Sequence, residues 1–373
     1  MRPVVPRNIR IIDVNAIREN MKALRQNTPT TAKMMAVVKA DAYGHGAFIT
    51  AKAVLESGAD MLAVATVGEG CELRELGIDA PILVLGAVTQ GDVRMGVDYG
   101  LIQTVCTPEM VCFCEQAGKE KRKQAEVHLS VDTGMGRIGV RSREEMDRVL
   151  ETIQLSQHVH LTGVFTHFSD ADGDEDGVSY TRKQFKRFCE LTDGLPENVI
   201  RHCDNSAAIH RMPDMAMNMV RAGISLYGYP PVNADILLQP CMEWRCKVSF
   251  VKDCPEGTYI SYGRTFRTVK PMRIATVTCG YGDGYHRNAS GKAEVLIRGQ
   301  RFRVIGRICM DQMMVDITGN DDIQPEDPVI LMGKCGEEAI GADDIAGWSG
   351  TISYEILLSA GSRVERQYTG GRP

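Results

Sequence analysis

The chain has 373 residues, of which 43% are apolar and 24% are charged, so it is long enough for one large and one smaller domain. Its formal net charge of −5 gives no general attraction to nucleic acid or to an anionic membrane surface. No apolar run approaches the roughly 20 residues that span a bilayer. We therefore expect neither nucleic acid nor a membrane among its partners.

Twelve cysteines are scattered through apparent core segments, and no two of them have the Cys-x-x-Cys spacing typical of zinc sites. A secreted chain would risk mispairing so many thiols, which favours a reducing cytoplasm. The first ten residues contain arginines and prolines but no apolar core, unlike a secretion signal. We expect a cytoplasmic protein without a bound metal.

Short apolar runs rich in β-branched residues alternate with longer amphipathic segments in residues 1–240. Eight runs are predicted as strands, at residues 34–39, 61–65, 81–86, 101–105, 126–131, 161–166, 199–202 and 217–221. Helical stretches lie between most of them, such as residues 48–57, 143–153 and 181–192. This order predicts an α/β fold with a (β/α)8 barrel of the TIM type, and an open doubly wound sheet is the alternative.

The pattern changes after Pro240, where helical periodicity fades. Alternating apolar and polar residues separated by turns are found at residues 246–251, 273–279, 294–298, 304–308 and 328–332. We therefore expect two domains, a barrel over residues 1–240 and a C-terminal β-rich domain over residues 241–373.

Unusual polar residues lie at the C-terminal ends of the predicted strands or just beyond them, with Lys39 and Arg221 as the last residues of theirs. They are Lys39, Asp132, Thr133, Gly134, Gly136, Arg137, His167, Asn205, Ser206, Arg221 and Gly223. In a barrel the C-terminal ends of the strands converge on one face, where active sites form. Because all of these residues lie on the C-terminal side of their strands, we predict an active site on that face of the barrel.

Lys39 follows three apolar residues, and burial by them favours the neutral amine that forms a Schiff base. A lysine that extends from the barrel mouth into solvent fits the segment equally well. The pairs Asn205-Ser206 and Gly223-Ile224 suit anion binding, although a turn with a helix cap gives the same pattern. A Schiff-base lysine and a phosphate site on one face suggest pyridoxal phosphate.

The second domain contains two glycine-flanked tyrosines, Tyr262 in Ser-Tyr-Gly-Arg and Tyr281 in Gly-Tyr-Gly-Asp. Tyrosines held in this way can be reactive, but without further context a turn is the better interpretation.

An ordered set of motifs across nearly the whole chain resembles the alanine racemase family of fold-type III pyridoxal-phosphate enzymes. The motifs are Ala-Val-Val-Lys-Ala-Asp-Ala-Tyr-Gly-His-Gly at 36–46, Asp-Thr-Gly-Met-Gly-Arg at 132–137, Thr-His-Phe at 166–168, Asn-Ser at 205–206, Arg-Ala-Gly-Ile at 221–224, Tyr-Gly at 227–228, Ser-Tyr-Gly at 261–263, Gly-Tyr at 280–281, Gly-Arg at 306–307, Met-Asp at 310–311, Tyr-Glu at 354–355 and residues 363–366. The resemblance implies a barrel, a C-terminal β domain and a head-to-tail homodimer whose active sites combine both subunits. It also implies the interconversion of L- and D-alanine.

The resemblance also assigns roles to individual residues. Lys39 would hold the cofactor and act as one acid/base, and Tyr262 of the partner subunit would act as the other. The expected cofactor contacts are Lys39, Tyr43, His167, Asn205, Ser206, Arg221, Gly223, Ile224 and Tyr354. The expected substrate contacts are Arg137, supported by His167, together with Met310 and Asp311. The expected entrance residues are Tyr262, Tyr281, Tyr354, Asp172, Arg287, Arg307 and Ile352.

Two bases on opposite faces of the α-carbon can remove and return its proton with inversion. Arg221 at the pyridine nitrogen would keep that nitrogen unprotonated, because two adjacent cations repel. This weakens the electron sink and is expected to suppress decarboxylation and transamination.

One position departs from the family. Where the family often has a lysine modified by carbon dioxide, this chain has Ser130, which cannot carry a carbamate. Arg137 would lose an anionic partner, and a chloride ion or another carboxylate is the expected replacement.

Three alternatives remain open on the sequence. They are a serine or broad-specificity racemase, a fold-type III decarboxylase, and a pyridoxal-phosphate-binding protein without catalysis. The bulky Tyr262 and Tyr354 favour a small substrate, and Arg221 argues against a decarboxylase, which has an acid at the pyridine nitrogen. The full second domain argues against a non-catalytic binder, which resembles the barrel alone. A role in D-alanine synthesis for peptidoglycan and a role in alanine catabolism are equally compatible with the sequence.

Overall fold

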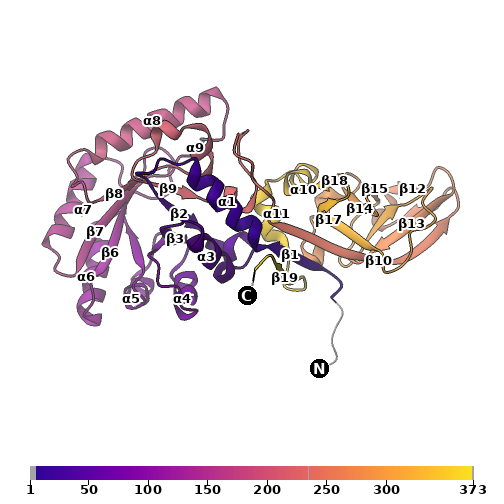
Figure 1. The fold of residues 1–373 in the computed structure, drawn as a ribbon, viewed down its shortest axis with the longest axis horizontal. Coiled ribbons are helices and arrows are strands. Elements are labelled where there is room, and N and C mark those ends of the chain that lie inside the picture. The colour runs from indigo at the N-terminus through magenta and orange to yellow at the C-terminus, as the bar shows by residue number, and fades with distance from the viewer. Residues whose placement is uncertain (1–5, 234, 372–373) are drawn as a thin grey trace. The chain divides into compact units, whose positions relative to one another are not determined.

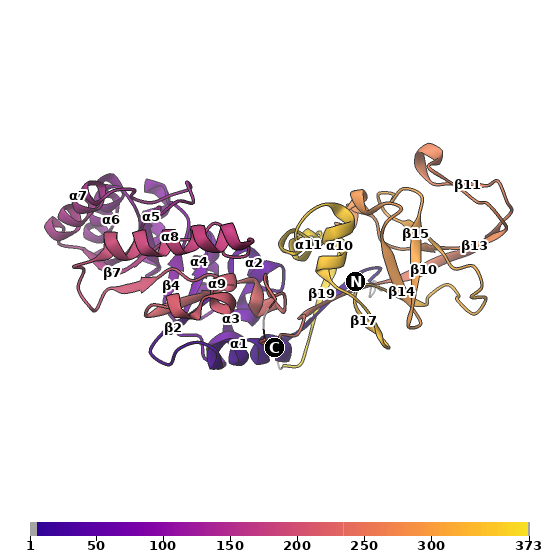
Figure 2. The ribbon, with the colours of Figure 1, turned by 90° about the horizontal axis from the view of Figure 1, so that it is seen from above.

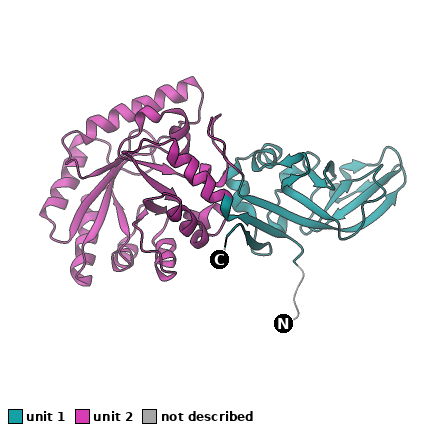
Figure 3. Cartoon of the chain, in the orientation of Figure 1, with its two compact units in different colours: residues 1–15, 240–373 teal, residues 16–239 magenta. Residues whose placement is uncertain are grey.

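The structure is a computed structural model that describes residues 6–233 and 235–371. Two compact units make up the chain: residues 16–239 form one, and residues 1–15 with 240–373 form the other (Figure 3).

The first unit is a closed barrel of eight parallel strands, taken in chain order (Figure 1). The strands are β2 (Lys33–Val37), β3 (Met61–Val64), β4 (Ile82–Val84), β5 (Ile102–Val105), β6 (Ala125–Ser130), β7 (Val159–Phe165), β8 (Ile200–His202) and β9 (Met219–Ala222). The last strand closes on the first, with Met34 opposite Val220. All four residues of β3 and of β5 are buried, as expected for parallel strands covered on both faces.

Helices connect the strands and lie outside them (Figure 2). They are α3 (Ala47–Glu56), α4 (Val67–Glu75), α5 (Gln90–Asp98), α6 (Pro108–Lys121), α7 (Arg143–Leu155), α8 (Glu175–Thr192) and α9 (Ser206–Arg211), with the single turns α2 (Lys39–Tyr43), η1 (Pro213–Met215) and η2 (Ile224–Tyr227). Helix α7 buries Met146, Val149 and Ile153, the one-sided spacing that packs a helix against a sheet. These residues share a core cluster with Phe188 of α8. Helix α1 (Val14–Gln26) precedes the first barrel strand.

The second unit is built on a nine-stranded sheet in the order β18-β17-β14-β15-β16-β13-β10-β1-β19. The strands are β1 (Ile9–Asp13), β10 (Met242–Cys254), β13 (Met272–Val277), β14 (Glu294–Ile297), β15 (Gln300–Ile305), β16 (Met313–Asp316), β17 (Pro328–Cys335), β18 (Glu338–Ile340) and β19 (Glu365–Thr369). A separate hairpin joins β11 (Tyr259–Ile260) to β12 (Phe266–Arg267). The helical elements are α10 (Ala342–Ser349), α11 (Ser353–Ser359), η3 (Tyr262–Arg264), η4 (Tyr281–Asp283) and η5 (Arg287–Ala289).

The predicted barrel is confirmed, since all eight predicted strands overlap strands of the closed barrel, and the open-sheet alternative is wrong. The predicted β-rich C-terminal part is also present, although helices α10 and α11 within it were not expected. One boundary differs from the prediction. The sequence assigned the first residues to the barrel, but β1 pairs antiparallel with β10 and parallel with β19 in the second unit. Such pairing between distant segments leaves no local sequence signal.

None of the described helices combines the length and the apolar character that crossing a membrane requires.

Candidate active site

The predicted site residues of the barrel lie at the C-terminal ends of its strands. Lys39 comes two residues after β2, Arg137 lies in the loop after β6, and His167 comes two residues after β7. Ser206 opens the helix after β8, and Arg221 is the penultimate residue of β9. The prediction that Lys39 ends its strand is therefore wrong by two residues.

Lys39 begins a turn with an unusual backbone. Ala40, Asp41, Ala42 and Tyr43 all have φ between 51° and 54°, which makes α2 a left-handed turn without any glycine. A left-handed residue with a Cβ costs about 1–2 kcal/mol, so the surroundings must hold this segment in place.

Two side chains, Glu69 and His45, hold the left-handed turn by hydrogen bonds. Glu69 of α4 accepts the Ala40 N–H at 2.6 Å with one carboxylate oxygen and the Ala65 N–H at 2.7 Å with the other. His45 is fully buried, and its Nδ1 lies 3.0 Å from the Tyr43 carbonyl oxygen. The turn is thus tied both to the end of the neighbouring strand and to its own continuation.

The Lys39 amine has a depressed pKa. Partial burial is the main cause, the positive charges of Arg137 and Arg221 lower the pKa further, and Glu69 opposes them. The neutral amine is the form that attacks a carbonyl carbon, so this environment suits a Schiff-base lysine.

Three residues of the barrel form a small hydroxyl-lined cradle. A Cβ on Gly223 would lie 3.2 Å from the Tyr43 hydroxyl oxygen and 3.5 Å from Ser206 Oγ. Ser206 Oγ accepts the Gly223 N–H at 2.9 Å, which leaves the serine proton to be donated elsewhere. The Ile224 N–H opens η2 and therefore has no acceptor within that helix. These donors suit a phosphate group.

The Asn205 side chain caps α9 by accepting the Ala208 N–H, so the predicted helix cap is present as well.

Arg221 is 3% exposed and is held by neutral acceptors. Its guanidinium donates to the carbonyl oxygens of Thr166 at 2.8 Å and Cys203 at 3.0 Å, and to His202 Nδ1 at 3.0 Å. A longer contact of 3.4 Å reaches His167 Nδ1. Among the described residues no carboxylate lies within ion-pair distance of this cation, and its Nε–H has no acceptor. Burial lowers the pKa of Arg221 to about 10, so it stays charged at neutral pH.

Two histidines beside Arg221 are neutral. Burial and the arginine charge lower the pKa of His167 to about 3 and that of His202 well below its ordinary value. His167 Nδ1 lies 3.4 Å from Arg221 Nη2. The expected support of Arg137 by His167 stays a prediction.

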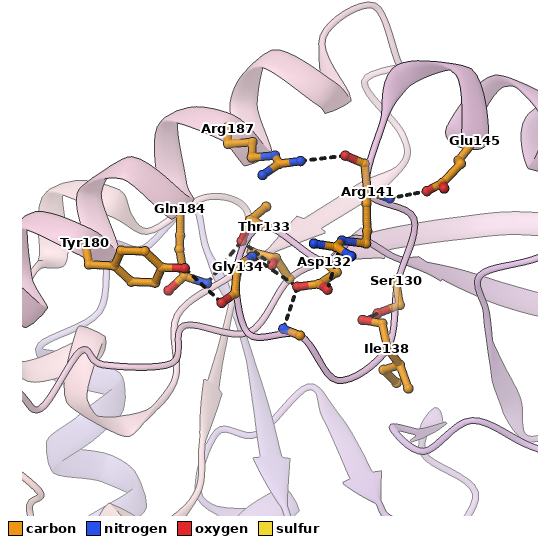
Figure 4. Close-up of polar contacts among 12 residues, drawn as sticks. Ser130, Asp132, Thr133, Gly134, Ile138, Arg141, Glu145, Tyr180, Gln184 and Arg187 are labelled. Atoms are coloured by element: carbon orange, nitrogen blue, oxygen red, sulfur yellow. Dashed lines mark hydrogen bonds and ion pairs between the residues drawn. The ribbon is translucent and has the colours of Figure 1, made fainter.

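The loop after β6 is anchored from both sides (Figure 4). Asp132 accepts the N–H groups of Gly134 and Gly136 at 3.0 and 2.9 Å. Gln184 of α8 donates to Thr133 Oγ1 at 3.3 Å and to the His167 carbonyl oxygen at 3.2 Å. This one buried amide therefore ties the loop after β6 to the loop after β7.

Arg137 extends from this loop and is exposed. It has no ion pair with a carboxylate in the described part of the chain, and the expected replacement by a chloride ion or another carboxylate stays a prediction. Arg137 and Ser130 line a cavity of about 20 Å³ together with His167. That volume admits one or two water-sized particles.

In the second unit, Tyr262 lies on an exposed, tightly constrained turn. Ser261 and Gly263 flank it with φ of 67° and 70°, and the Ser261 hydroxyl donates to the Arg307 carbonyl oxygen. The Tyr262 side chain is 66% exposed. A rigid turn that presents a phenol to solvent suits a residue that acts on something outside its own unit.

A second cluster gathers around Arg363, which the sequence analysis assigned no role. Its guanidinium contacts Asp311 at 2.8 Å and the buried Asp283 at 3.2 Å. The Tyr281 N–H donates to the Cys309 carbonyl oxygen, while the Met310 N–H has no acceptor among the described residues. A free backbone N–H at Met310 suits a carboxylate ligand.

The remaining predicted entrance residues differ in exposure. Asp172, Arg287, Arg307 and Ile352 are exposed, and Tyr354 of α11 is half-buried.

Comparison with known proteins decides the family. The model of the alanine racemase N-terminal domain matches residues 12–231, and the model of the C-terminal domain matches residues 241–368. The chain belongs to the alanine racemase family.

Individual relatives agree with this family. The alanine racemase of Halothermothrix orenii is 40% identical over 365 residues, which is 96% of this chain and 95% of that protein. The solved alanine racemase of Clostridium difficile 630 has a TM-score of 0.91 and 38% identity, covering 98% of this chain and 97% of that one. A histidine racemase from Leuconostoc mesenteroides has a TM-score of 0.89 at 26% identity, covering 98% and 99%. The fold of the alanine racemase family therefore accommodates more than one racemase.

The sequence did not identify several residues whose hydrogen bonds hold the candidate active site of this alanine racemase fold in place. Glu69, Gln184 and His202 were not singled out. Only Glu69 carried a local signal, since Thr66 and Glu69 have the spacing of a helix capping box.

We predict that Glu69→Gln destabilises the protein by about 1–3 kcal/mol, because an amide NH2 would replace an oxygen that accepts a backbone N–H. Urea unfolding followed by circular dichroism measures the change. Glu72→Gln, on the exposed face of the same helix, is the control and should lie within about 0.5 kcal/mol of the wild type. Equal stability of the two variants would show that the carboxylate does not hold the left-handed turn.

Proposed function

We propose that the protein interconverts L- and D-alanine with pyridoxal phosphate as its cofactor. One observation carries the proposal. A lysine with a depressed pKa shares a barrel end with a buried arginine whose acceptors are all neutral. The membership of the alanine racemase family supports the same reaction.

The residues present fit the cofactor. Lys39 supplies the amine, and the hydroxyls of Tyr43 and Ser206 with the Ile224 N–H supply donors for the phosphate. The Nε–H of Arg221 is available to a ring nitrogen, which can accept it only when unprotonated. When bound, pyridoxal phosphate supplies an electron sink for the charge left on the α-carbon.

Two side chains move the proton. The Lys39 amine takes or returns it on one face of the α-carbon, and Tyr262 of the partner subunit does so on the other. The exposed position of Tyr262 supports a role toward a second subunit. We therefore infer a homodimer with shared active sites.

Substrate binding would fall to the barrel unit of one subunit and the second unit of its partner. The Arg137 guanidinium and the Met310 N–H would bind the substrate carboxylate, with Asp311 beside them. Tyr262 and Tyr354 would narrow the entrance, which favours alanine over larger amino acids. Because the histidine racemase shares the fold, specificity rests on these side chains rather than on architecture.

A decarboxylase is disfavoured by the absence of a carboxylate within ion-pair distance of Arg221 in the described residues. The charge of Asp204 acts on Arg221, but this carboxyl group is itself buried, and burial raises its pKa to about 6.

We predict that Lys39→Ala and Tyr262→Phe each lower the racemisation rate by about 10²–10⁴-fold, because each removes one proton-transfer group. The assay follows incorporation of deuterium at the α-carbon of L-alanine in heavy water and formation of D-alanine. Mixing the two inactive variants and allowing subunits to exchange should restore about a quarter of the wild-type rate, since half of the dimers then carry one intact centre.

Lys52→Ala and Tyr259→Phe are the matched controls, because both side chains are exposed outside the proposed site. Full racemase activity in Lys39→Ala would reject the assignment. Absence of recovery on mixing, while light scattering shows exchanged dimers, would reject shared sites.

We further propose that a chloride ion beside Ser130 supplies the negative charge that orients Arg137. The small cavity that Ser130 and Arg137 line together supports this.

Replacing chloride by gluconate at constant ionic strength is expected to raise the KM for alanine about tenfold, which corresponds to the loss of one charge-assisted hydrogen bond. Ser130→Asp carries its own negative charge and should lose this dependence. An unchanged KM of the wild type in gluconate would contradict the chloride site.

A further inference from the structure

A chain of three buried side chains runs from Arg221 into the barrel interior. Arg221 Nη1 lies 3.0 Å from His202 Nδ1, and His202 Nε2 lies 2.9 Å from His128 Nδ1. Both histidines have no exposed surface. They come from β8 and β6, which lie on either side of β7, so the two rings meet on the inner side of β7.

The direction of donation along this chain is fixed by arginine. A guanidinium has only donors, so His202 Nδ1 must accept. A neutral His202 then carries its proton on Nε2 and donates it to His128 Nδ1. A neutral His128 carries its proton on Nε2 in turn. Burial and the Arg221 charge lower the pKa of His128 to about 3, so the neutral form dominates at physiological pH.

The last donor in this series of hydrogen bonds, the Nε2–H of His128, lies away from the active site. His128 Nε2 is buried and has no hydrogen-bond partner among the described residues. His128 lines a cavity of about 240 Å³ with Lys33, Met61 and Ile102, which begin or nearly begin their strands. The cavity therefore lies at the N-terminal end of the barrel, away from the end that carries Lys39.

The backbone makes room for the His128 ring. A Cβ on Gly163 of β7 would lie 2.5 Å from His128 Cε1, so only glycine fits there. The pairing of β6 with β7 shifts register at this point, between Val127 and His128. A glycine and a β-bulge together seat this one side chain.

We propose that His128 is a positioning residue, which accepts the His202 N–H and so keeps His202 Nδ1 available to hold Arg221. This inference rests on the proposed function only in one respect, which is that Arg221 contacts the cofactor ring. The contact between the His202 and His128 rings does not depend on the proposed function.

A role in packing alone is the competing explanation, and two variants separate the two. His128→Asn keeps a polar acceptor near the position of Nδ1, whereas His128→Leu fills a similar volume without an acceptor. If His128 serves packing alone, His128→Leu should keep more activity than His128→Asn. If His128 accepts the His202 N–H, His128→Asn should keep more activity than His128→Leu.

The first arm of the test is ¹⁵N NMR of the histidine-labelled protein, in which two-bond couplings report the tautomer. The chain has 8 histidines, and the ¹⁵N–¹⁵N coupling across the hydrogen bond between the two rings identifies this pair without a variant. We expect His128 and His202 to be neutral with protons on Nε2 in the wild type. A proton on Nδ1 of either ring, or a charged ring, would overturn the inference even if both variants fail to fold.

The second arm is kinetic. His128→Leu should lower kcat about tenfold, roughly the equivalent of one hydrogen bond, and change the KM for alanine less than about twofold. His128→Asn should stay within about threefold of the wild type. Equal losses in both variants, or no loss in His128→Leu, would overturn the inference. If the wild type does not racemise alanine, the proposed function fails, and the NMR arm still decides the direction of donation.

Discussion

The burial of the Arg221 guanidinium is the constraint on which the rest of the site depends. An unpaired buried cation costs several kcal/mol unless hydrogen bonds replace the lost water. Here the replacement comes from two backbone carbonyls, at Thr166 and Cys203, and from His202. Both carbonyls directly follow barrel strands, so closure of the barrel itself creates the acceptors.

The choice of neutral acceptors has a chemical consequence. A carboxylate beside Arg221 would cancel its charge, whereas carbonyls and a neutral imidazole leave the charge in place. Burial is the main cause of the depressed pKa of His167, His202 and Lys39, and the Arg221 charge lowers each of them further. The buried cation thus adds to the effect of burial in keeping the groups around it neutral.

The left-handed turn after Lys39 is a segment of strained backbone at the candidate active site. Four non-glycine residues adopt positive φ there, and Glu69 and His45 hold them by hydrogen bonds. The turn brings the Tyr43 hydroxyl beside Ser206, the first residue of α9, and beside Gly223, which follows β9. The local cost is offset by contacts that only the folded barrel supplies.

The sequence predicted those features that have a local signal. Apolar runs identified every barrel strand, and polar residues after the strands identified Lys39, Ser206 and Arg221. The left-handed turn had no such signal, because Ala40 and Ala42 do not favour positive φ and their support lies about 30 residues away in Glu69. His202 and His128 were missed because a buried histidine in a strand looks like any other strand residue. Strand β1 was missed because its partners lie more than 200 residues away.

The central claim is that Arg221 keeps the pyridine nitrogen of the cofactor unprotonated. The most direct measurement is the ¹⁵N chemical shift of ring-labelled pyridoxal phosphate bound to the wild-type protein between pH 6 and pH 9. The account predicts the shift of an unprotonated nitrogen across this range, because burial lowers the pKa of Arg221 only to about 10 and leaves it charged. The shift of a protonated nitrogen would contradict it.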